Sequence, residues 1–380
     1  MTAIQFAAAY CLATTSIQVL STLIAMPRCA KRRAPLPAPA AAPPVSVVRP
    51  LCGVDPFAEE TLASSFGLDY PSYEIIFCLA KPDDPAAPLV RRLIETHPET
   101  PARLLIGDDR PSSNPKLNNV VKGWKASAHD WIIIADSNVL MPGDYIQRMM
   151  ARWRPNTGIV CAPPVGSAPR FFPAEVECAF LNGYQARWQY AGEALGFGFA
   201  QGKSMLWRRS ILEARGGIEA LGNEIAEDAA ATKLVHRAGL SAHLVDSPFE
   251  QPLGPRQWRE VWARQLRWAR LRRATFPLQF APEILTTSLF TFIAAFYSAP
   301  LFGLGPFAAL ALVALAWYGS EAALARVAGW RLSWWSAPAA MARNIALPWL
   351  WAQAWASDSF VWRGNEMSVA EDDAGAAAGR

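Results

Sequence analysis

The first long apolar run of the chain lies close to its start. Residues 4–26 hold no charge and have about the length that an α-helix needs to cross a bilayer. Positive charge follows this run rather than preceding it, which favours an uncleaved anchor whose C-terminal end is cytoplasmic over a signal peptide. We therefore predict a transmembrane anchor over residues 1–27 and a basic, Pro-rich linker over 28–44, with a surface-lying amphipathic helix as the alternative. The basic residues are Arg28, Lys31, Arg32 and Arg33.

Apolar runs return in the last third of the chain. Residues 283–302 and 303–318 are nearly uncharged and predict two spans or a hairpin. Residues 337–355 are apolar but contain Arg343, Asn344 and Gln353, so they predict a third span or an interfacial segment. We expect membrane helices within residues 276–362. The small, polar residues 363–380 predict a disordered tail.

Between these ends the pattern changes to short apolar runs that alternate with helical spacing. Such alternation predicts parallel βαβ units and an α/β fold over residues 45–275. In open α/β sheets the ligand lies beyond the carboxyl ends of the strands, so polar residues there are the first site candidates. The predicted strands are VSVV (45–48), YEIIFCLA (73–80), ARLLIG (102–107) and DWIIIAD (130–136).

Composition supports a soluble domain combined with membrane segments. Of 380 residues, 52% are hydrophobic and only 18% are charged, which excludes a disordered chain and disfavours a wholly soluble one. A mean hydropathy of +0.10 is too low for a chain that is membrane throughout. The net charge of +4 makes no case for nucleic acid. The six Cys are scattered without a CxxC pair, which argues against zinc and against a disulfide framework and fits a reducing compartment.

Four polar groups stand where chemistry is plausible. Asp83–Asp84 and Asp136–Asn138 each follow a predicted strand, Glu227–Asp228 begins a predicted helix, and residues 264–268 lie on a very basic helix. Singly, each has a plain structural explanation, because acids after strands often form turns or helix caps. A basic helix with aromatics can equally be an interfacial anchor that binds anionic lipid.

Together the four groups describe one reaction. One strand-end carboxylate can hold a uridine, and a second acid followed by Asn can ligate Mg²⁺ or Mn²⁺, which prefer oxygen ligands and bridge to phosphates. A third acid can take a proton from a hydroxyl acceptor. Arginine with an aromatic side chain can neutralise charge on a leaving diphosphate. That set is typical of sugar transfer from a nucleotide sugar.

The arrangement resembles the ceramide glucosyltransferases of glycosyltransferase family 21, which are relatives of family 2. RPLCGVDP (49–56) is similar to their KPLKGVDP opening, and NPKLNN (114–119) to their NPKINN. CLAKPDDPA (78–86) looks like their first-aspartate motif. The order of Asp136, then AED at 226–228, then RQLRW at 264–268 reproduces their D, D and (Q/R)xxRW series. The resemblance covers about residues 45–272.

The resemblance implies a GT-A, Rossmann-like catalytic domain and a role for each matching residue. Asp228 would be the catalytic base, and a Mg²⁺ or Mn²⁺ ion would be held by Asp136 and Asn138. The donor-binding set would be Asp84, Lys116, Asn118 and Asp136. The set that binds diphosphate and acceptor would be Arg264, Gln265, Arg267 and Trp268.

By the same resemblance the reaction would be an inverting transfer of a hexose, foremost glucose, from a UDP-sugar to the primary hydroxyl of ceramide. The Ala-rich and Arg-rich composition suggests a bacterial genome, so with its apolar runs we expect an integral protein of the bacterial inner membrane whose catalytic domain faces the cytoplasm. Two positions depart from the family. Asn138 stands where many glycosyltransferases have a second acid, which puts the metal contact in question. Gln185 stands where the family has a histidine linked with the donor site, which puts the donor in question.

Other interpretations remain open at this stage. The same chemistry with UDP-glucuronate on ceramide, or with UDP-N-acetylglucosamine on a hopanoid lipid, would use the same residues. A processive polysaccharide synthase normally has more membrane helices around its RW motif than this sequence shows. A non-catalytic lipid-binding protein would have no need of the complete set of acids and the RW pair.

Overall fold

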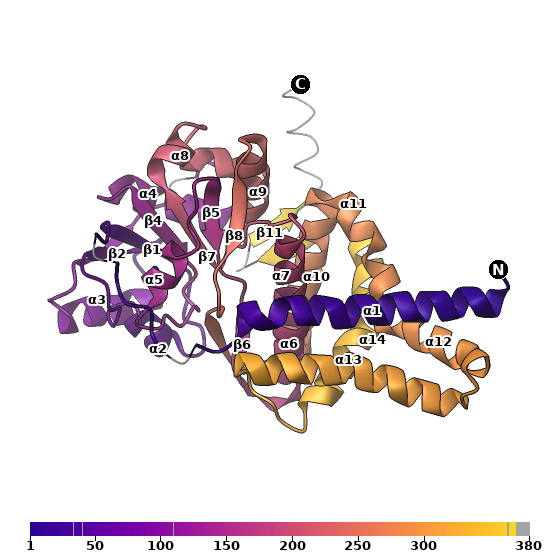
Figure 1. Ribbon diagram of the computed structural model, residues 1–380. Coiled ribbons are helices and arrows are strands. Elements are labelled where there is room, and N and C mark those ends of the chain that lie inside the picture. Colours follow the sequence, from indigo (N-terminus) through magenta and orange to yellow (C-terminus); the bar gives the residue numbers. More distant parts are fainter. Residues whose placement is uncertain (33, 40, 109, 363–364, 370–380) are drawn as a thin grey trace. The chain divides into compact units, whose positions relative to one another are not determined.

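The computed structural model describes residues 1–32, 34–39, 41–108, 110–362 and 365–369, and it divides into two compact units (Figure 1). We call Met1–Lys31, Gly166–Ala191 and Pro255–Ser359 the helical unit. Arg32–Val165, Gly192–Gly254 and Phe360–Arg380 form the sheet unit. Arg33 of the basic linker and most of the predicted tail lie outside the described residues; of that tail, 365–369 are described and include a short strand, β11 (Asn365–Ser368).

The sheet unit contains a seven-stranded sheet of order β3-β2-β1-β4-β7-β5-β8. Strand β1 pairs in parallel with β2 and β4, and β2 pairs in parallel with β3, as the sequence predicts. Strand β7 runs antiparallel to both of its neighbours, β4 and β5. The strands are β1 (Val45–Leu51), β2 (Tyr73–Leu79), β3 (Ala102–Ile106), β4 (Trp131–Ala135), β5 (Thr157–Cys161), β7 (Ser204–Arg208) and β8 (Ser241–Leu244).

Helices cover both faces of this sheet, because its central strands are apolar on both sides. On one face Ile75 and Phe77 pack with the apolar sides of α2 (Ala58–Ala63) and α3 (Ala86–Thr96). On the other face α4 (Pro115–Ala126) lies directly on β1 and β2. A Cβ on Gly123 of α4 would lie 2.5 Å from Val48 Cγ1, so only glycine allows this close approach. The predicted α/β class is confirmed.

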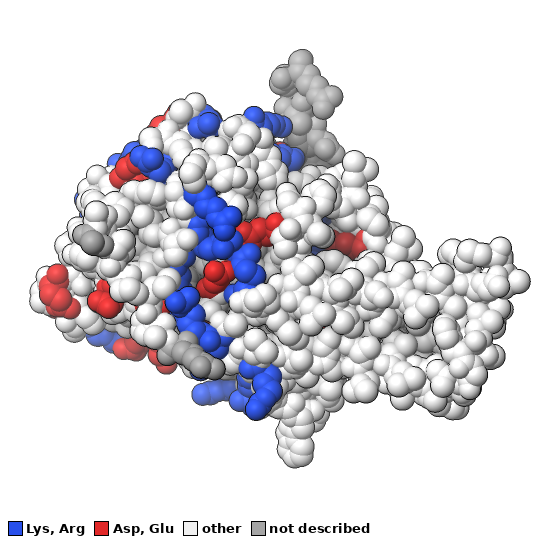
Figure 2. All heavy atoms as spheres, viewed as in Figure 1, with Lys and Arg blue, Asp and Glu red and all other residues white. Residues whose placement is uncertain are grey.

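The helical unit contains three helices long and apolar enough to cross a membrane, which are Ala3–Cys29, Pro277–Phe302 and Pro306–Ala328. The first is α1, the second includes α12 (Ser288–Ser298), and the third is α13. In Figure 2 the surface of these helices is almost entirely uncharged. The predicted combination of an α/β domain with apolar helices before and after it is confirmed.

The helical unit also contains the long helices α10 (Trp258–Thr275) and α14 (Ser336–Ala356), which pack against each other. The predicted apolar stretch 337–355 falls within α14. Its Arg343 donates to Glu321 of α13 at 2.9 Å, and Gln18 of α1 donates to the same carboxylate at 3.0 Å. Because an unpaired charge costs several kcal/mol in apolar surroundings, this contact holds three helices together in one arrangement.

The remaining elements are short. Strands β6 (Val165–Arg170) and β9 (Glu250–Pro255) form one two-stranded sheet, and β10 (Ser359–Trp362) pairs with β11. Each of β6, β9 and β10 contains a point at which the chain passes between units. The other helical segments of the described chain are α5 (Tyr145–Met150), α6 (Phe171–Ala179), a π-helix (Phe180–Ala186), α7 (Arg187–Ala194), α8 (Arg209–Glu213), α9 (Glu227–Arg237), α11 (Pro277–Phe280) and the 3₁₀ helices Ile218–Asn223, Ala281–Thr286 and Ala299–Phe302.

Candidate active site

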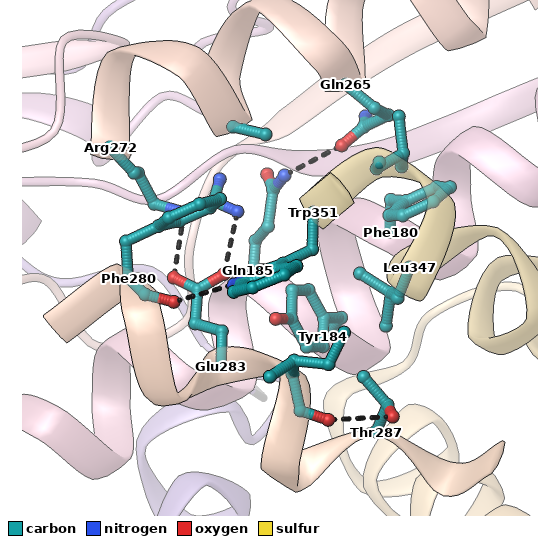
Figure 3. Close-up of a pocket in the computed structure, with 13 residues that line it drawn as sticks. Phe180, Tyr184, Gln185, Gln265, Arg272, Phe280, Glu283, Thr287, Leu347 and Trp351 are labelled. Atoms are coloured by element: carbon teal, nitrogen blue, oxygen red, sulfur yellow. Dashed lines mark hydrogen bonds and ion pairs between the residues drawn. The ribbon is translucent and has the colours of Figure 1, made fainter. Parts of the chain in front are cut away.

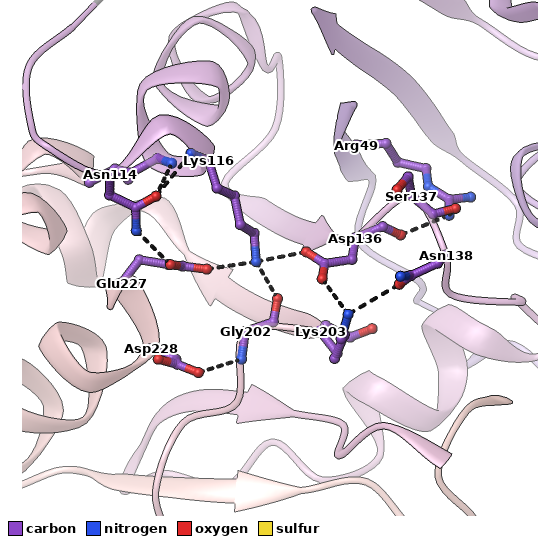
Figure 4. Close-up of polar contacts among 12 residues, drawn as sticks. Arg49, Asn114, Lys116, Asp136, Ser137, Asn138, Gly202, Lys203, Glu227 and Asp228 are labelled. Carbon is purple, nitrogen blue, oxygen red and sulfur yellow. Dashed lines mark hydrogen bonds and ion pairs between the residues drawn. The ribbon is translucent and has the colours of Figure 1, made fainter. Parts of the chain in front are cut away.

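Asp136 follows β4 directly, at the carboxyl edge of the parallel strands (Figure 4). The backbone of the turn that contains Asp136 is held by Arg49 of β1, which is fully buried. Its Nη2 donates to the backbone oxygens of Asp136 at 2.9 Å, of Ser137 at 2.9 Å and of Val139 at 3.1 Å. Burial lowers the pKa of Arg49 to about 10, yet the group stays charged at neutral pH. A buried guanidinium thus fixes the backbone on which the predicted metal ligands stand.

Lys116 lies in the first turn of α4 and reaches the side chain of Asp136. The helix begins at Asn114, whose Oδ1 accepts from the backbone N–H groups of Lys116 and Leu117 at 2.9 and 3.1 Å. The Nζ atom of Lys116 lies 2.7 Å from Asp136 Oδ1 and 2.6 Å from Glu227 Oε1. The NPK part of the NPKLNN motif therefore caps a helix and also aims a cation at two acids.

Glu227 and Asp228 begin α9 and belong to the same cluster as Lys116. Glu227 contacts Lys116 directly, and Asp228 is linked to Lys116 through the backbone of Gly202. The Asn114 Nδ2 group donates to Glu227 Oε2 at 2.8 Å. The backbone oxygen of Gly202 accepts from Lys116 Nζ at 2.6 Å, and its N–H donates to Asp228 Oδ2 at 3.1 Å. One peptide segment thus joins the candidate base to the lysine that holds Asp136, as Figure 4 shows.

The predicted base Asp228 and the predicted metal ligand Asp136 have opposite electrostatic surroundings. Burial tends to raise the pKa of Asp136, but the charges of Lys116 and Lys203 outweigh it and hold that pKa well below its usual range. Burial and the nearby Glu227 charge raise the pKa of Asp228 to about 6, against a smaller opposing effect of Lys116. Acids whose pKa values are driven apart in this way are suited to different roles in one site. Asp136 remains a permanent anion, whereas Asp228 can exchange a proton near neutral pH.

Asn138, the other predicted metal ligand, shares a partner with Asp136. Lys203 Nζ lies 2.8 Å from Asp136 Oδ2 and 3.2 Å from Asn138 Oδ1. Both side chains offer oxygens of the kind that Mg²⁺ and Mn²⁺ prefer, so they fit such an ion once the lysine is displaced. Within the part of the chain that the structure describes, no three His, Cys, Asp or Glu side chains are grouped to hold a metal. A divalent ion here would take its remaining ligands from diphosphate oxygens and water.

Asp84 and Asn118, both predicted to bind the donor, lie outside this contact network. Asp84 accepts from the backbone N–H groups of Gly53 at 3.0 Å and Ala86 at 2.8 Å, so it ties the loop after β1 to the start of α3. Asn118 exchanges hydrogen bonds with Ser112, donating to its backbone oxygen at 2.9 Å. Asp84 stands beyond β2, two strands from Asp136. The donor-binding roles of both residues stay predictions.

The four residues predicted from RQLRW all lie on α10 in the helical unit. Arg264 pairs with buried Glu177 of α6 through a 2.5 Å contact. Gln265 is buried and accepts from Gln185 Nε2 at 3.1 Å, so the position that departs from the family's histidine contacts the RQLRW motif. These two glutamines line a pocket with Tyr184, Phe280 and Trp351 (Figure 3). Arg267 and Trp268 are partly buried, and their diphosphate and acceptor roles stay predictions.

The sequence analysis does not predict four residues of the cluster, which are Arg49, Asn114, Gly202 and Lys203. Arg49 and Asn114 stand inside motifs that the family resemblance quotes, so their position was a usable signal. Lys203 precedes β7, which pairs antiparallel with β4 so that Ala135 faces Ser204. That pairing puts Lys203 opposite Asp136, and no local pattern around residue 203 indicates it.

Replacing Gly202 by Ala should reduce turnover about tenfold or more. A Cβ there would lie 2.9 Å from Glu227 Oε1 and 3.2 Å from Lys116 Nζ. Both groups are held by other partners and cannot move away without breaking ion pairs, and overpacking of this kind costs about 1–3 kcal/mol. Steady-state kinetics and thermal unfolding would measure the effect. Gly67→Ala is the matched control, because its nearest neighbour would be Ser64 O at 3.9 Å; equal activity of the two variants would contradict the prediction.

The family model described as Glycosyl transferase family 21 matches residues 13–374. Ceramide glucosyltransferase 1 of Caenorhabditis elegans is 30% identical over 237 residues, which are 62% of this chain and 51% of that protein. Ceramide glucosyltransferase 3 of the same organism is 25% identical over 335 residues, or 86% of this chain and 73% of that protein. The chain thus spans about half the length of the first relative and nearly three quarters of the second.

Solved structures give weaker likenesses. The mannosyltransferase PcManGT from Pyrobaculum calidifontis, in complex with GDP-Man and Mn²⁺, has a TM-score of 0.45 at 20% identity and covers 92% of this chain and 96% of its own. Glucosyl-3-phosphoglycerate synthase from Mycobacterium tuberculosis has a TM-score of 0.38 at 15% identity and covers 62% of this chain and 80% of its own.

Proposed function

Because the chain belongs to glycosyl transferase family 21, we propose that it transfers a hexose, foremost glucose, from a UDP-sugar to the primary hydroxyl of ceramide. The observation that supports this proposal most is that Asp136 and Asp228 are linked by hydrogen bonds and differ in their pKa. Asp136 is an anion fixed by two lysines, and Asp228, linked to it through Gly202 and Lys116, has a pKa raised toward neutrality. A permanently charged group and a proton acceptor are the two parts that such a transfer needs.

In the proposed reaction Asp228 acts as the general base. The acceptor oxygen attacks the anomeric carbon, the bond from that carbon to the diphosphate oxygen breaks, and the hydroxyl proton goes to Asp228. A single displacement of this kind inverts the anomeric configuration. The N–H groups of Gly202 and Ala229 each donate to one carboxylate oxygen of Asp228, at 3.1 and 2.9 Å, and so hold it in one orientation.

Asp136 and Asn138 are the residues that would hold a divalent ion. When bound there, Mg²⁺ or Mn²⁺ would offset the negative charge that gathers on the departing diphosphate. Lys116 serves the same electrostatic purpose from the opposite side of Asp136, because three oxygens fix its ammonium group. The metal dependence is part of the proposal and is supported by the oxygen ligands of the site.

The acceptor class agrees with the helical unit. Three apolar helices fit a membrane-associated protein, and a lipid acceptor would be reached from the bilayer. Arg28 lies in the last turn of α1 and Lys31 and Arg32 follow the helix, and positive charge beside a span marks its cytoplasmic end. We propose that the protein lies in the bacterial inner membrane and that its catalytic residues face the cytoplasm, where nucleotide sugars are made.

Product mass tests the proposal directly. The full-length protein in detergent or nanodiscs would receive UDP-glucose, UDP-glucuronate or UDP-N-acetylglucosamine, each with ceramide or a hopanoid alcohol, and Asp228→Asn protein would be the control. Hexosylceramide formed only by the wild type is the expected result. Glucuronosylceramide or an N-acetylglucosaminyl hopanoid would move the substrate to the alternatives, and a growing polymer would indicate a synthase. Absence of any glycosylated lipid from protein that binds UDP would contradict the proposal.

The pH profile should report the titration of Asp228. Burial and Glu227 raise its pKa to about 6, and only the ionised form accepts a proton. The value of kcat/KM should therefore fall about tenfold per pH unit below pH 6 and level off above about pH 7. Initial rates between pH 4.5 and 8.5 at low donor concentration would measure it. A midpoint near pH 4, the value of an ordinary Asp, would show that Asp228 is not the base.

A further inference from the structure

Lys203 occupies the place between the two predicted metal ligands. Its Nζ atom is 2.8 Å from Asp136 Oδ2 and 3.2 Å from Asn138 Oδ1 (Figure 4). The backbone keeps it there, because the Asp136 N–H donates to the Lys203 oxygen at 3.0 Å and β7 continues as a sheet neighbour of β4. The lysine is therefore aligned by the sheet, and its contacts with both oxygens follow from that alignment.

A cation in this place excludes a second one. A divalent ion binds carboxylate and amide oxygens at 2.0–2.2 Å, so it needs the space and the lone pairs that the Lys203 ammonium now uses. Two positive charges within a few ångströms of each other also repel strongly in a partly buried site. Binding of the ion thus requires the Lys203 head group to leave.

The two lysines of the cluster contact different oxygens of Asp136. Lys116 is fixed by Asp136, by Glu227 and by the backbone oxygen of Gly202, and its side chain is 11% exposed. The Lys203 side chain is 14% exposed and faces Asp136 Oδ2, the oxygen that Lys116 does not contact. Lysine has a flexible stem and a compact charge, which suits a group that moves between two anionic partners.

We propose that Lys203 is an internal cation that competes with the divalent ion for Asp136 and Asn138 and binds the donor's diphosphate when the ion is absent. The second half of this statement rests on the proposed function, because it assumes a nucleoside diphosphate donor. In the wild-type protein the Lys203 ammonium group then weakens metal binding at Asp136 and Asn138. Removing the lysine charge should make the site bind the metal more tightly and should make binding of the donor's diphosphate depend on the ion.

Mn²⁺ titration of the full-length protein without donor tests the competition. The electron paramagnetic resonance signal of free Mn²⁺ would give the dissociation constant for wild type, Lys203→Met, Lys203→Gln and Lys203→Arg. We expect the Lys203→Met and Lys203→Gln proteins to bind Mn²⁺ at least about tenfold more tightly than wild type, because a neighbouring like charge is removed. The Lys203→Arg protein keeps the charge and should bind Mn²⁺ as wild type does. Asp136→Asn should lose the tight site. Lys233→Met is the matched control, since it removes a lysine paired at 2.7 Å with Glu224.

UDP binding then tests the second half. With EDTA, Lys203→Met should bind UDP about tenfold more weakly than wild type, and Mn²⁺ should restore its affinity. Unchanged or weaker Mn²⁺ binding by both the Met and the Gln variants would overturn the proposal, whatever the donor does. If UDP binds to no variant and not to wild type, with or without Mn²⁺, the proposed function fails, while the Mn²⁺ titration still decides the competition.

Discussion

Asp228→Asn protein should transfer sugar about 10³-fold more slowly than wild type, because general base catalysis contributes about 10²–10⁴-fold and an amide cannot accept the proton. The change keeps the shape of the side chain, so the UDP dissociation constant should stay within about threefold. Single-turnover measurement of lipid product and calorimetric UDP binding would separate the two. Asp246→Asn is a matched control, because the Asp246 side chain is 42% exposed and is paired with Arg152.

The same variant should be more stable than wild type at neutral pH. The folded-state pKa of Asp228 is raised above its usual value, so the folded protein binds this proton more readily than the unfolded chain does. Stability of the wild type therefore falls as the pH rises through about 6, and Asn removes that penalty. We expect a higher Tm for the variant at pH 8 and no difference near pH 4. Lower stability together with lost activity would indicate a structural role instead.

Lys116→Met should cause the largest loss of stability in the cluster. It removes a cation that lies 2.7 Å from Asp136 and 2.6 Å from Glu227, whose side chains are 21% and 10% exposed. Removing one partner of a buried ion pair costs about 3–5 kcal/mol, because the other charge stays behind unpaired. Denaturant unfolding would measure this loss, and turnover should fall below detection because Asp136 and Glu227 lose their position.

A double variant separates charge from packing. Lys116→Met with Glu227→Gln removes the unpaired acid as well, so most of the lost stability should return while activity stays absent. Lys125→Met, at an ion pair whose lysine is 63% exposed, should change stability by no more than about 0.5 kcal/mol. If the double variant is as unstable as Lys116→Met, loss of packing rather than an unpaired charge is responsible.

The local pattern of apolar residues predicts the strands β1, β2, β3 and β4 of the sheet. The runs at residues 45–48, 73–80, 102–107 and 130–136 are mostly apolar, and each is a strand in the expected parallel arrangement. Parallel strands end at one edge, so Asp136 and the start of α4 could be expected to meet there. The convergence of Lys116, Asp136 and the AED sequence followed from that geometry together with the family motifs.

The second half of the sheet could not be expected in the same way. Strand β7 is inserted antiparallel between β4 and β5, and its partners are set by tertiary pairing across about 70 residues rather than by periodicity. The sequence pattern therefore does not predict that Lys203 and Gly202 lie in the site. Asn118 lies in a recognised motif and bonds the neighbouring loop residue Ser112, and its donor-binding role stays a prediction.

The interleaving of the two units has a consequence for how this protein is made and divided. Strand β7 lies between β4 and β5 in the sheet, yet residues 166–191 of the helical unit come between β5 and β7 along the chain. During synthesis, residues 166–191 of the helical unit therefore leave the ribosome before β7 can enter the sheet between β4 and β5. A protein trimmed at its apolar ends would therefore still contain residues 166–191 of the helical unit between two strands of the sheet.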